Sequence, residues 1–283
     1  MIDDQRGFQQ SYYDRHYPKR VAAVRDQLAH PLFRSFYDRL AGRVLDLGAG
    51  PRPAEGQGPL RVFEAGCGEG FLGSALHRQA AARGLELAYS GADLSAAALD
   101  LARPSVGRDL EVGDATEVTA SLPSASRDLV IVKNLLHHLD DPAGLLREAA
   151  RVVGPTGRVA VVEARLGCPQ FWVFTFLAPR RERYFFKGAG RNLDAIAEAG
   201  LELVGEDRFS ILPYELAFHI RFSVFRRLLG THDRRAIERF SRLDDRLAST
   251  LPWLSSYVIW AAAPASASAP ACVPTDAGGT NST

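Results

Sequence analysis

Glycines alternate with other residues directly after an apolar run that is typical of a buried strand. The run is Val62–Ala65, and the glycines are Gly66, Gly68 and Gly70. Glycine lets the chain turn tightly with positive φ and lets a ligand lie against bare backbone. A helix predicted to start at Phe71 supplies unpaired N–H groups at its N-terminus. We interpret this stretch as a ligand-binding turn of a kind that several classes of nucleotide-binding protein use.

Acidic residues lie where three successive strands are predicted to end. Glu64 precedes the glycines, Asp93 follows the next strand, and Asp114 follows the third. The carboxyl ends of parallel strands line the ligand crevice of an open α/β sheet. A carboxylate at Asp93 can accept hydrogen bonds from both hydroxyls of a ribose, and one at Asp114 can accept from an exocyclic adenine amine. The fourth strand ends in the segment Asn134 to His138, on the same rim.

The apolar periodicity of the chain predicts its elements. Residues 8–41 carry apolar residues at three- and four-residue intervals and are predicted to be helical. From Arg43 to Glu163, short β-branched runs alternate with Ala- and Leu-rich stretches, which is typical of βαβ units around a parallel sheet. The expected strands are 62–65, 87–92, 110–112, 129–132, 159–162, 201–204 and 257–262. The expected helices among them are 71–83, 96–101, 143–153 and 193–199.

These elements predict an α/β fold, a Rossmann-like doubly wound sheet that is mostly parallel, with N-terminal and C-terminal helical caps. We expect residues 1–41 to form the N-terminal cap. Residues 42–263 should form the main domain, with a helical substrate cap within about 214–251. The tail, 264–283, is rich in Pro, Ala and Ser and cannot bury enough apolar surface to order itself.

The composition excludes several kinds of protein. The chain has 283 residues, 46% hydrophobic, and its net charge of +1 gives no electrostatic case for a nucleic-acid partner. Cys67, Cys168 and Cys272 have neither disulfide-framework nor zinc-ligand spacing, so no metal is expected. The first residues lack the features of a signal peptide, and the longest uncharged apolar run, 166–179, is too short to span a bilayer. We therefore expect a soluble, cytoplasmic protein.

Together the motifs resemble the class I S-adenosylmethionine-dependent methyltransferases that modify small molecules. The resemblance is strong from Arg61 to Glu163. It implies that the Glu-x-Gly-x-Gly-x-Gly turn holds the methionine part of S-adenosylmethionine, that Asp93 holds the ribose and that Asp114 holds the adenine. It also implies a final strand antiparallel to the others, and methyl transfer to a small acceptor without a metal. The residues that it assigns to the cofactor are Glu64, Gly66, Gly68, Gly70, Asp93, Leu94, Asp114, Ala115, Asn134 and His138. Cys67, inside the turn, is expected to contact the cofactor as a small filler.

Other interpretations stay open. The stretch Arg43–Gly50 also looks like a cofactor strand with a glycine turn, but the prolines and glycines that follow it cannot propagate a helix. We therefore choose the second copy and expect the first to be an extra edge strand or hairpin. The segment 68–73 also satisfies the dinucleotide fingerprint, so an NAD(P)-dependent oxidoreductase is the main alternative. Glu64 and Asp114 would have no role in that class. A non-catalytic cofactor-binding partner subunit is a further hypothesis, against which the intact turn argues.

His137 and His138 are the candidate catalytic residues, because imidazole titrates near neutral pH. A general base is needed only when the acceptor must lose a proton, as a phenol, an alcohol or an acidic carbon does. Adjacent histidines on a strand-to-helix turn are more often structural. Packing or contact with the cofactor is therefore the other interpretation.

Three further stretches suggest how an acceptor is bound. Tyr12, Tyr13 and Tyr17 could form a lid by cation–π contact, or an aromatic stripe packed on the sheet. The aromatic cluster 171–186 suits the wall of a pocket for a hydrophobic or aromatic acceptor, or the core. The arginine-rich stretch 214–251 could contact a membrane surface, but its interspersed acids favour a solvated helical face.

Overall fold

A computed structural model describes residues 29–50, 58–165, 189–211 and 234–265, together with Val21, Val24, Gln27 and Cys168. Three features proposed from the sequence lie wholly or mainly outside these residues. They are the tyrosines near the N-terminus, the aromatic cluster 171–186 and the first part of the substrate cap. The part of the chain that the structure describes contains no helix long and apolar enough to cross a membrane.

The described residues form a seven-stranded sheet in the order β3-β2-β1-β4-β5-β7-β6. Neighbours among β1 to β5 pair in parallel, whereas β7 is antiparallel to both β5 and β6. The α/β fold and its final antiparallel strand are therefore confirmed. The strands are β1 (Leu60–Ala65), β2 (Leu87–Asp93), β3 (Leu110–Val112), β4 (Leu129–Lys133), β5 (Arg158–Ala164), β6 (Leu201–Phe209) and β7 (Tyr257–Pro264).

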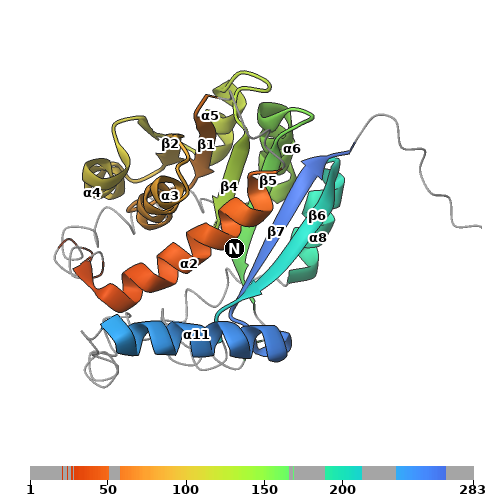
Figure 1. Cartoon of the computed structure of the whole chain (residues 1–283). Coiled ribbons are helices and arrows are strands. Elements are labelled where there is room, and N and C mark those ends of the chain that lie inside the picture. Colours follow the sequence, from red (N-terminus) through yellow and green to blue (C-terminus); the bar gives the residue numbers. More distant parts are fainter. Residues whose placement is uncertain are drawn as a thin grey trace, which may run out of the picture.

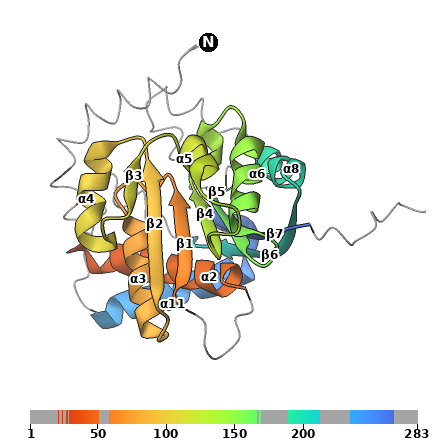
Figure 2. The same ribbon diagram turned by 90° about the horizontal axis from the view of Figure 1, so that it is seen from above.

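Helices cover both faces of the sheet, as Figure 2 shows. One hydrophobic core joins the sheet to α2, α3, α4 and α11, and a second joins it to α5, α6 and α8. The central strands are buried on both faces, as a parallel sheet between two helical layers requires. The helices are α2 (Pro31–Gly48), α3 (Phe71–Ala82), α4 (Ala96–Val106), α5 (Ala115–Ser121), α6 (Pro142–Val153), α8 (Ala189–Glu198) and α11 (Arg234–Thr250), with short 3-10 turns η1 (Leu136–His138) and η4 (Pro252–Leu254).

The first copy of the turn motif is helical, so the expected edge strand or hairpin at Arg43–Gly50 is wrong. Helix α2 starts with Pro31 and continues to Gly48, through the expected domain boundary at 41/42. Val44 and Leu45 follow Leu40 at helical spacing and bury on the same face. The second copy has the predicted strand, turn and helix, because β1 leads into the glycine turn and then into α3.

Helix α11 lies alongside α2 (Figure 1) and is joined to it by a group of paired charges. Asp244, whose side chain is fully buried, accepts from the Arg39 guanidinium at 2.9 Å and from the Ile211 backbone N–H at 2.8 Å. Asp245 accepts from Arg39 at 2.8 Å and from Arg43 at 2.9 Å. These ion pairs fix α11 against α2.

Replacing Asp244 by alanine should lower the free energy of unfolding by about 3 kcal/mol, because removal of one partner leaves a guanidinium and a backbone N–H without their buried acceptor. The matched control is Asp100→Ala, which removes a 73%-exposed carboxylate paired with Arg103. That change should cost no more than about 0.5 kcal/mol. Urea denaturation of both variants measures the difference, and equal losses would show that α11 does not depend on the buried pair.

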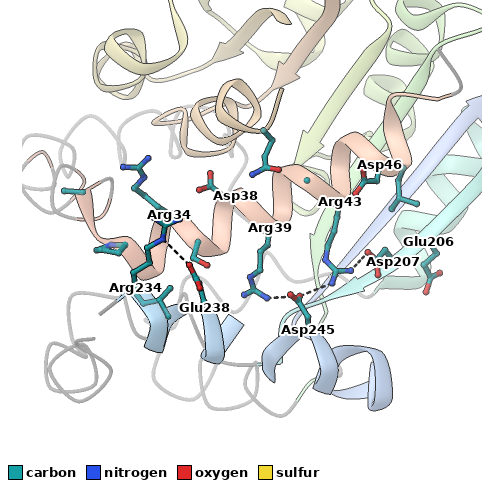
Figure 3. Close-up of a pocket in the computed structure, with 17 residues that line it drawn as sticks. Arg34, Asp38, Arg39, Arg43, Asp46, Glu206, Asp207, Arg234, Glu238 and Asp245 are labelled. Carbon is teal, nitrogen blue, oxygen red and sulfur yellow. Dashed lines mark hydrogen bonds and ion pairs between the residues drawn. The ribbon is translucent and has the colours of Figure 1, made fainter. Parts of the chain in front are cut away.

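A cavity of about 1060 Å³ opens between α2, α11 and β6 (Figure 3). Arg39 and Arg43 reach across it from α2 towards Asp245 on α11 and Asp207 on β6. None of the cofactor or catalytic residues proposed from the sequence lines it. Its charged walls pair with one another and hold the helices together. The residues proposed for the cofactor lie instead at the carboxyl ends of the strands.

Candidate cofactor-binding and catalytic site

The turn after β1 is built from left-handed backbone. Gly66, Gly68 and Gly70 have φ of 72°, 52° and 72°. The N–H groups of Gly66 and Cys67 both donate to the Ala92 carbonyl, at 2.8 and 3.0 Å, which ties the turn to the end of β2. A Cβ on Gly70 would come within 2.8 Å of the Ala102 Cβ, so the third glycine is needed for packing against α4.

Gly68 differs from Gly70 in the space beside it. Among the described residues, a Cβ built there would meet only a carboxylate oxygen of Asp93, at 4.0 Å. The backbone at this position is therefore accessible to a ligand on the side that faces Asp93. Cys67 is buried, and burial raises the pKa of its thiol, which is consistent with a neutral filler behind the turn.

Asp93 closes the turn. One carboxylate oxygen accepts from the Gly68 N–H at 2.9 Å, and the other accepts from the Ser95 N–H at 2.9 Å. Burial raises the pKa of Asp93, and these two hydrogen bonds act in the opposite direction. A carboxylate has about four acceptor positions, so two stay available for a ligand. Leu94, the next residue, is partly buried.

Asp114 lies at the end of the neighbouring strand, where it caps helix α5. Its carboxylate accepts from the Thr116 N–H at 2.8 Å and from the Glu117 N–H at 3.3 Å. Gly113 N–H donates to the Asp93 carbonyl at 3.0 Å, so the two acidic residues lie on adjacent strand ends. Ala115 starts α5 and is buried.

Glu64 lies inside the sheet layer with 2% of its surface exposed. The Tyr89 hydroxyl, on the neighbouring strand β2, donates to Glu64 Oε2 at 2.7 Å. Burial raises the pKa of Glu64 to about 7, although the Tyr89 hydrogen bond and the Lys133 charge favour the ionised form. Sequence reasoning missed Tyr89, because a tyrosine within a strand has no pattern that separates it from core residues.

Asn134 follows β4 and has the unusual positive φ of 50°. Its side-chain Oδ1 is buried and has no hydrogen-bond partner among the described residues. Buried polar atoms are nearly always paired, and the exceptions are often where a ligand binds. This oxygen therefore marks a place for a ligand donor beside the glycine turn.

His137 and His138 form the 3-10 turn after Asn134 and have different surroundings. Glu163, at the end of β5, accepts from the backbone N–H groups of Leu135 and Leu136 at 3.0 and 2.9 Å. Its Oε2 lies 2.7 Å from His137 Nδ1. Burial, and then the neighbouring imidazole, lowers the pKa of His138 to about 3, so His138 is neutral and a weak base. Of the two candidates, His137 has a ring that a carboxylate orients.

The strand order brings these residues to one rim. Strands β3, β2, β1, β4 and β5 are successive neighbours, and their ends carry Asp114, Asp93, Glu64, Asn134 and Glu163 respectively. No group of three or more metal-ligating side chains occurs among the residues that the structure describes. The rim therefore offers a bare glycine backbone, carboxylate acceptors and one oriented imidazole.

The strand order with β7 between β5 and β6, together with this glycine turn and its flanking acids, defines the class I methyltransferase fold. The family model described as "Methyltransferase domain" matches residues 63–161. Residues 63–161 thus match the methyltransferase family, and the strand order is that of its class I, S-adenosylmethionine-dependent fold.

Comparisons with known proteins agree with this assignment. A ubiquinone biosynthesis O-methyltransferase of Paracidovorax citrulli is 31% identical over 140 residues, which are 44% of this chain and 57% of that protein. The chain thus matches little more than half the length of this relative. A solved Thermotoga maritima methyltransferase, described as a possible histamine N-methyltransferase, has a TM-score of 0.52 at 14% identity, over 89% of this chain and 96% of that one. Geranyl diphosphate C-methyltransferase of Streptomyces coelicolor has a TM-score of 0.51 at 17% identity, over 80% and 75%. At these identities the two structures establish the fold alone.

Proposed function

We propose that this protein transfers a methyl group from S-adenosylmethionine to the hydroxyl of a small hydrophobic or aromatic acceptor. The observation that carries the cofactor assignment is the open backbone at Gly68 beside the Asp93 carboxylate. The methionine part would lie against the glycine turn, with the ribose on Asp93 and the adenine near Asp114 and Ala115. The unpartnered Oδ1 of Asn134 supports this fit, because a cofactor donor would satisfy it.

The bound cofactor would supply a methyl carbon activated by a sulfonium, from which S-adenosylhomocysteine leaves as the acceptor attacks in line. The chain must then align the acceptor and remove its proton. We propose that His137 is the base. With Nδ1 directed to Glu163, the remaining nitrogen, Nε2, is the one that can take a proton from an acceptor hydroxyl. Glu163 would stabilise the imidazolium that results.

The choice of oxygen over nitrogen or carbon rests on this base. A phenol or alcohol must lose a proton during methylation, whereas a neutral amine attacks first and loses its proton afterwards. The curated relative named above is an O-methyltransferase, which agrees with the same choice. The hydrophobic character of the acceptor rests on the aromatic cluster 171–186 alone.

The dinucleotide alternative finds less support. The dinucleotide fold has the parallel strand order 3-2-1-4-5-6, whereas here the antiparallel β7 lies between β5 and β6. Asp114, which has no role in an oxidoreductase, lies next to Asp93 on the rim.

Calorimetry with S-adenosylhomocysteine and with NAD tests the cofactor. We expect micromolar-range binding of the first and no heat from the second, and the reverse result would overturn the proposal. Methyl-labelled S-adenosylmethionine, offered with para-butylphenol or para-butylaniline as matched acceptors, tests the nucleophile. Label in the phenol supports oxygen transfer, and label only in the aniline contradicts it. Cofactor binding with no turnover of any acceptor would favour a non-catalytic partner subunit.

A further inference from the structure

A phenol and a carboxyl group form a buried pair directly behind the glycine turn. Glu64 is the second-last residue of β1 and Tyr89 lies in the adjacent strand β2, with 2% and 5% of their surfaces exposed. The 2.7 Å hydrogen bond from the Tyr89 hydroxyl to Glu64 Oε2 occupies one carboxylate oxygen. The other carboxylate oxygen of Glu64 can still accept a hydrogen bond from a ligand. Glu64 lies two residues before Gly66, the first glycine of the turn.

The Tyr89 ring is held in place by helix α3. A Cβ on Gly73 would lie 2.5 Å from Tyr89 Cζ and 2.6 Å from its hydroxyl oxygen. Only a residue without a side chain leaves room for the phenol at this point. Tyr89 is therefore confined between α3 and the sheet, and its hydroxyl has a fixed direction towards Glu64.

Titratable groups from three elements lie near Glu64. Lys133, at the end of β4, favours its ionised form, and Asp93, at the end of β2, opposes it. The Cys67 thiol, in the turn, is neutral because burial raises its pKa. Burial is the largest influence on Glu64 and raises its pKa to about 7, so this carboxyl group is close to half-ionised at neutral pH.

We propose that Tyr89 is a positioning residue that holds Glu64 towards the amino-acid end of the cofactor, and that binding of the cofactor ammonium group ionises Glu64 and releases its proton to solvent. The proposal rests on the proposed function, because it needs the methionine part at the turn. Binding converts the neutral Glu64 carboxyl group into a carboxylate and releases one proton to solvent. The Tyr89 hydrogen bond stabilises the carboxylate that binding creates.

Calorimetry with S-adenosylhomocysteine, in two buffers with different heats of ionisation, tests the proposal. If only ionised Glu64 binds, the wild type should bind about eightfold more tightly at about pH 7.5 than at about pH 6. About 0.9 proton per ligand should be released at the lower pH. Tyr89→Phe removes a donor to the carboxylate, so the pH at which binding weakens should rise by about one unit, and the affinity at about pH 7 should fall roughly fivefold.

Two variants serve as controls. Glu64→Gln should remove both the pH dependence and the proton release. Tyr257→Phe changes another buried tyrosine, in β7, and should bind as the wild type does. If the wild type binds no S-adenosylhomocysteine at any pH, the proposed function fails. If it binds with equal affinity at both pH values, or if Tyr89→Phe matches the wild type, this inference alone fails. Should Tyr89→Phe not fold, the proton count of the wild type against Glu64→Gln still decides the matter.

Discussion

Replacing Asp93 by alanine should weaken binding of S-adenosylhomocysteine by a factor of about 100 or more. In the proposed site the carboxylate accepts two ribose hydroxyls, and hydrogen bonds to a charged group contribute about 1.5–3 kcal/mol each. Two such bonds amount to about 3 kcal/mol or more, and each 1.4 kcal/mol is a factor of about ten in affinity. The same substitution also removes the acceptor of the Gly68 N–H and so loosens the turn. Isothermal titration calorimetry measures the loss.

A carboxylate at the amino ends of the strands, opposite to the rim, provides the matched control. Asp128 precedes β4 and accepts from the Arg61 backbone N–H at 2.8 Å, in the same way as Asp93 accepts from Gly68. Asp128→Ala should leave the affinity for S-adenosylhomocysteine unchanged. Asp93→Asn keeps one oxygen acceptor and should lie between alanine and the wild type. Wild-type affinity in Asp93→Ala would remove the ribose assignment.

The sheet could be predicted from the sequence because its central strands are continuous apolar runs. β4 and β5 are buried on both faces, so the runs 129–132 and 159–162 contain no polar residue, and in β1 only Glu64 interrupts the run 62–65. The edge strand β6 was expected to end at residue 204, but it continues to Phe209. Its later residues include three successive charged side chains, Glu206 to Arg208, because this edge strand is largely exposed, and such a run carries little strand signal.

The errors came from short-range patterns that longer-range packing overrides. The Gly-x-Gly at residues 48–50 looks like a binding turn, yet Val44 and Leu45 already belong to the buried stripe of α2. Helix α5 is only seven residues long and was not expected. The pattern Asp114-x-x-Glu117, an N-cap acid with a Glu three residues later, could have indicated its start.

The candidate site likewise contains residues that the sequence predicts and residues that only the structure brings together. The glycine turn, Asp93 and Asp114 each lie at a strand end that the sequence predicts, so their shared rim follows from topology alone. Tyr89 and Glu163 act through contacts that join separate strands, at separations of 25 and 26 residues from Glu64 and His137. No local pattern encodes such pairs. Only the register of β1 with β2, and of β4 with β5, brings them together.

Replacing His137 by alanine should lower kcat for a phenolic acceptor by a factor of about 100 to 10,000, the range that a general base contributes. The affinity for S-adenosylhomocysteine should stay within about twofold of the wild type, because the base acts on the acceptor proton. Initial rates with labelled S-adenosylmethionine and para-butylphenol measure kcat, and calorimetry measures the affinity.

Glu163→Gln separates orientation from proton transfer. It keeps an oxygen near His137 Nδ1 but loses the negative charge that stabilises the imidazolium, so kcat should fall about tenfold or more with little change in KM. His77→Gln, in helix α3, is the control histidine variant and should keep wild-type kcat. If His137→Ala retains wild-type kcat, then the 2.7 Å contact with Glu163 serves only to hold the turn after β4, and the acceptor must lose its proton to another group or to water.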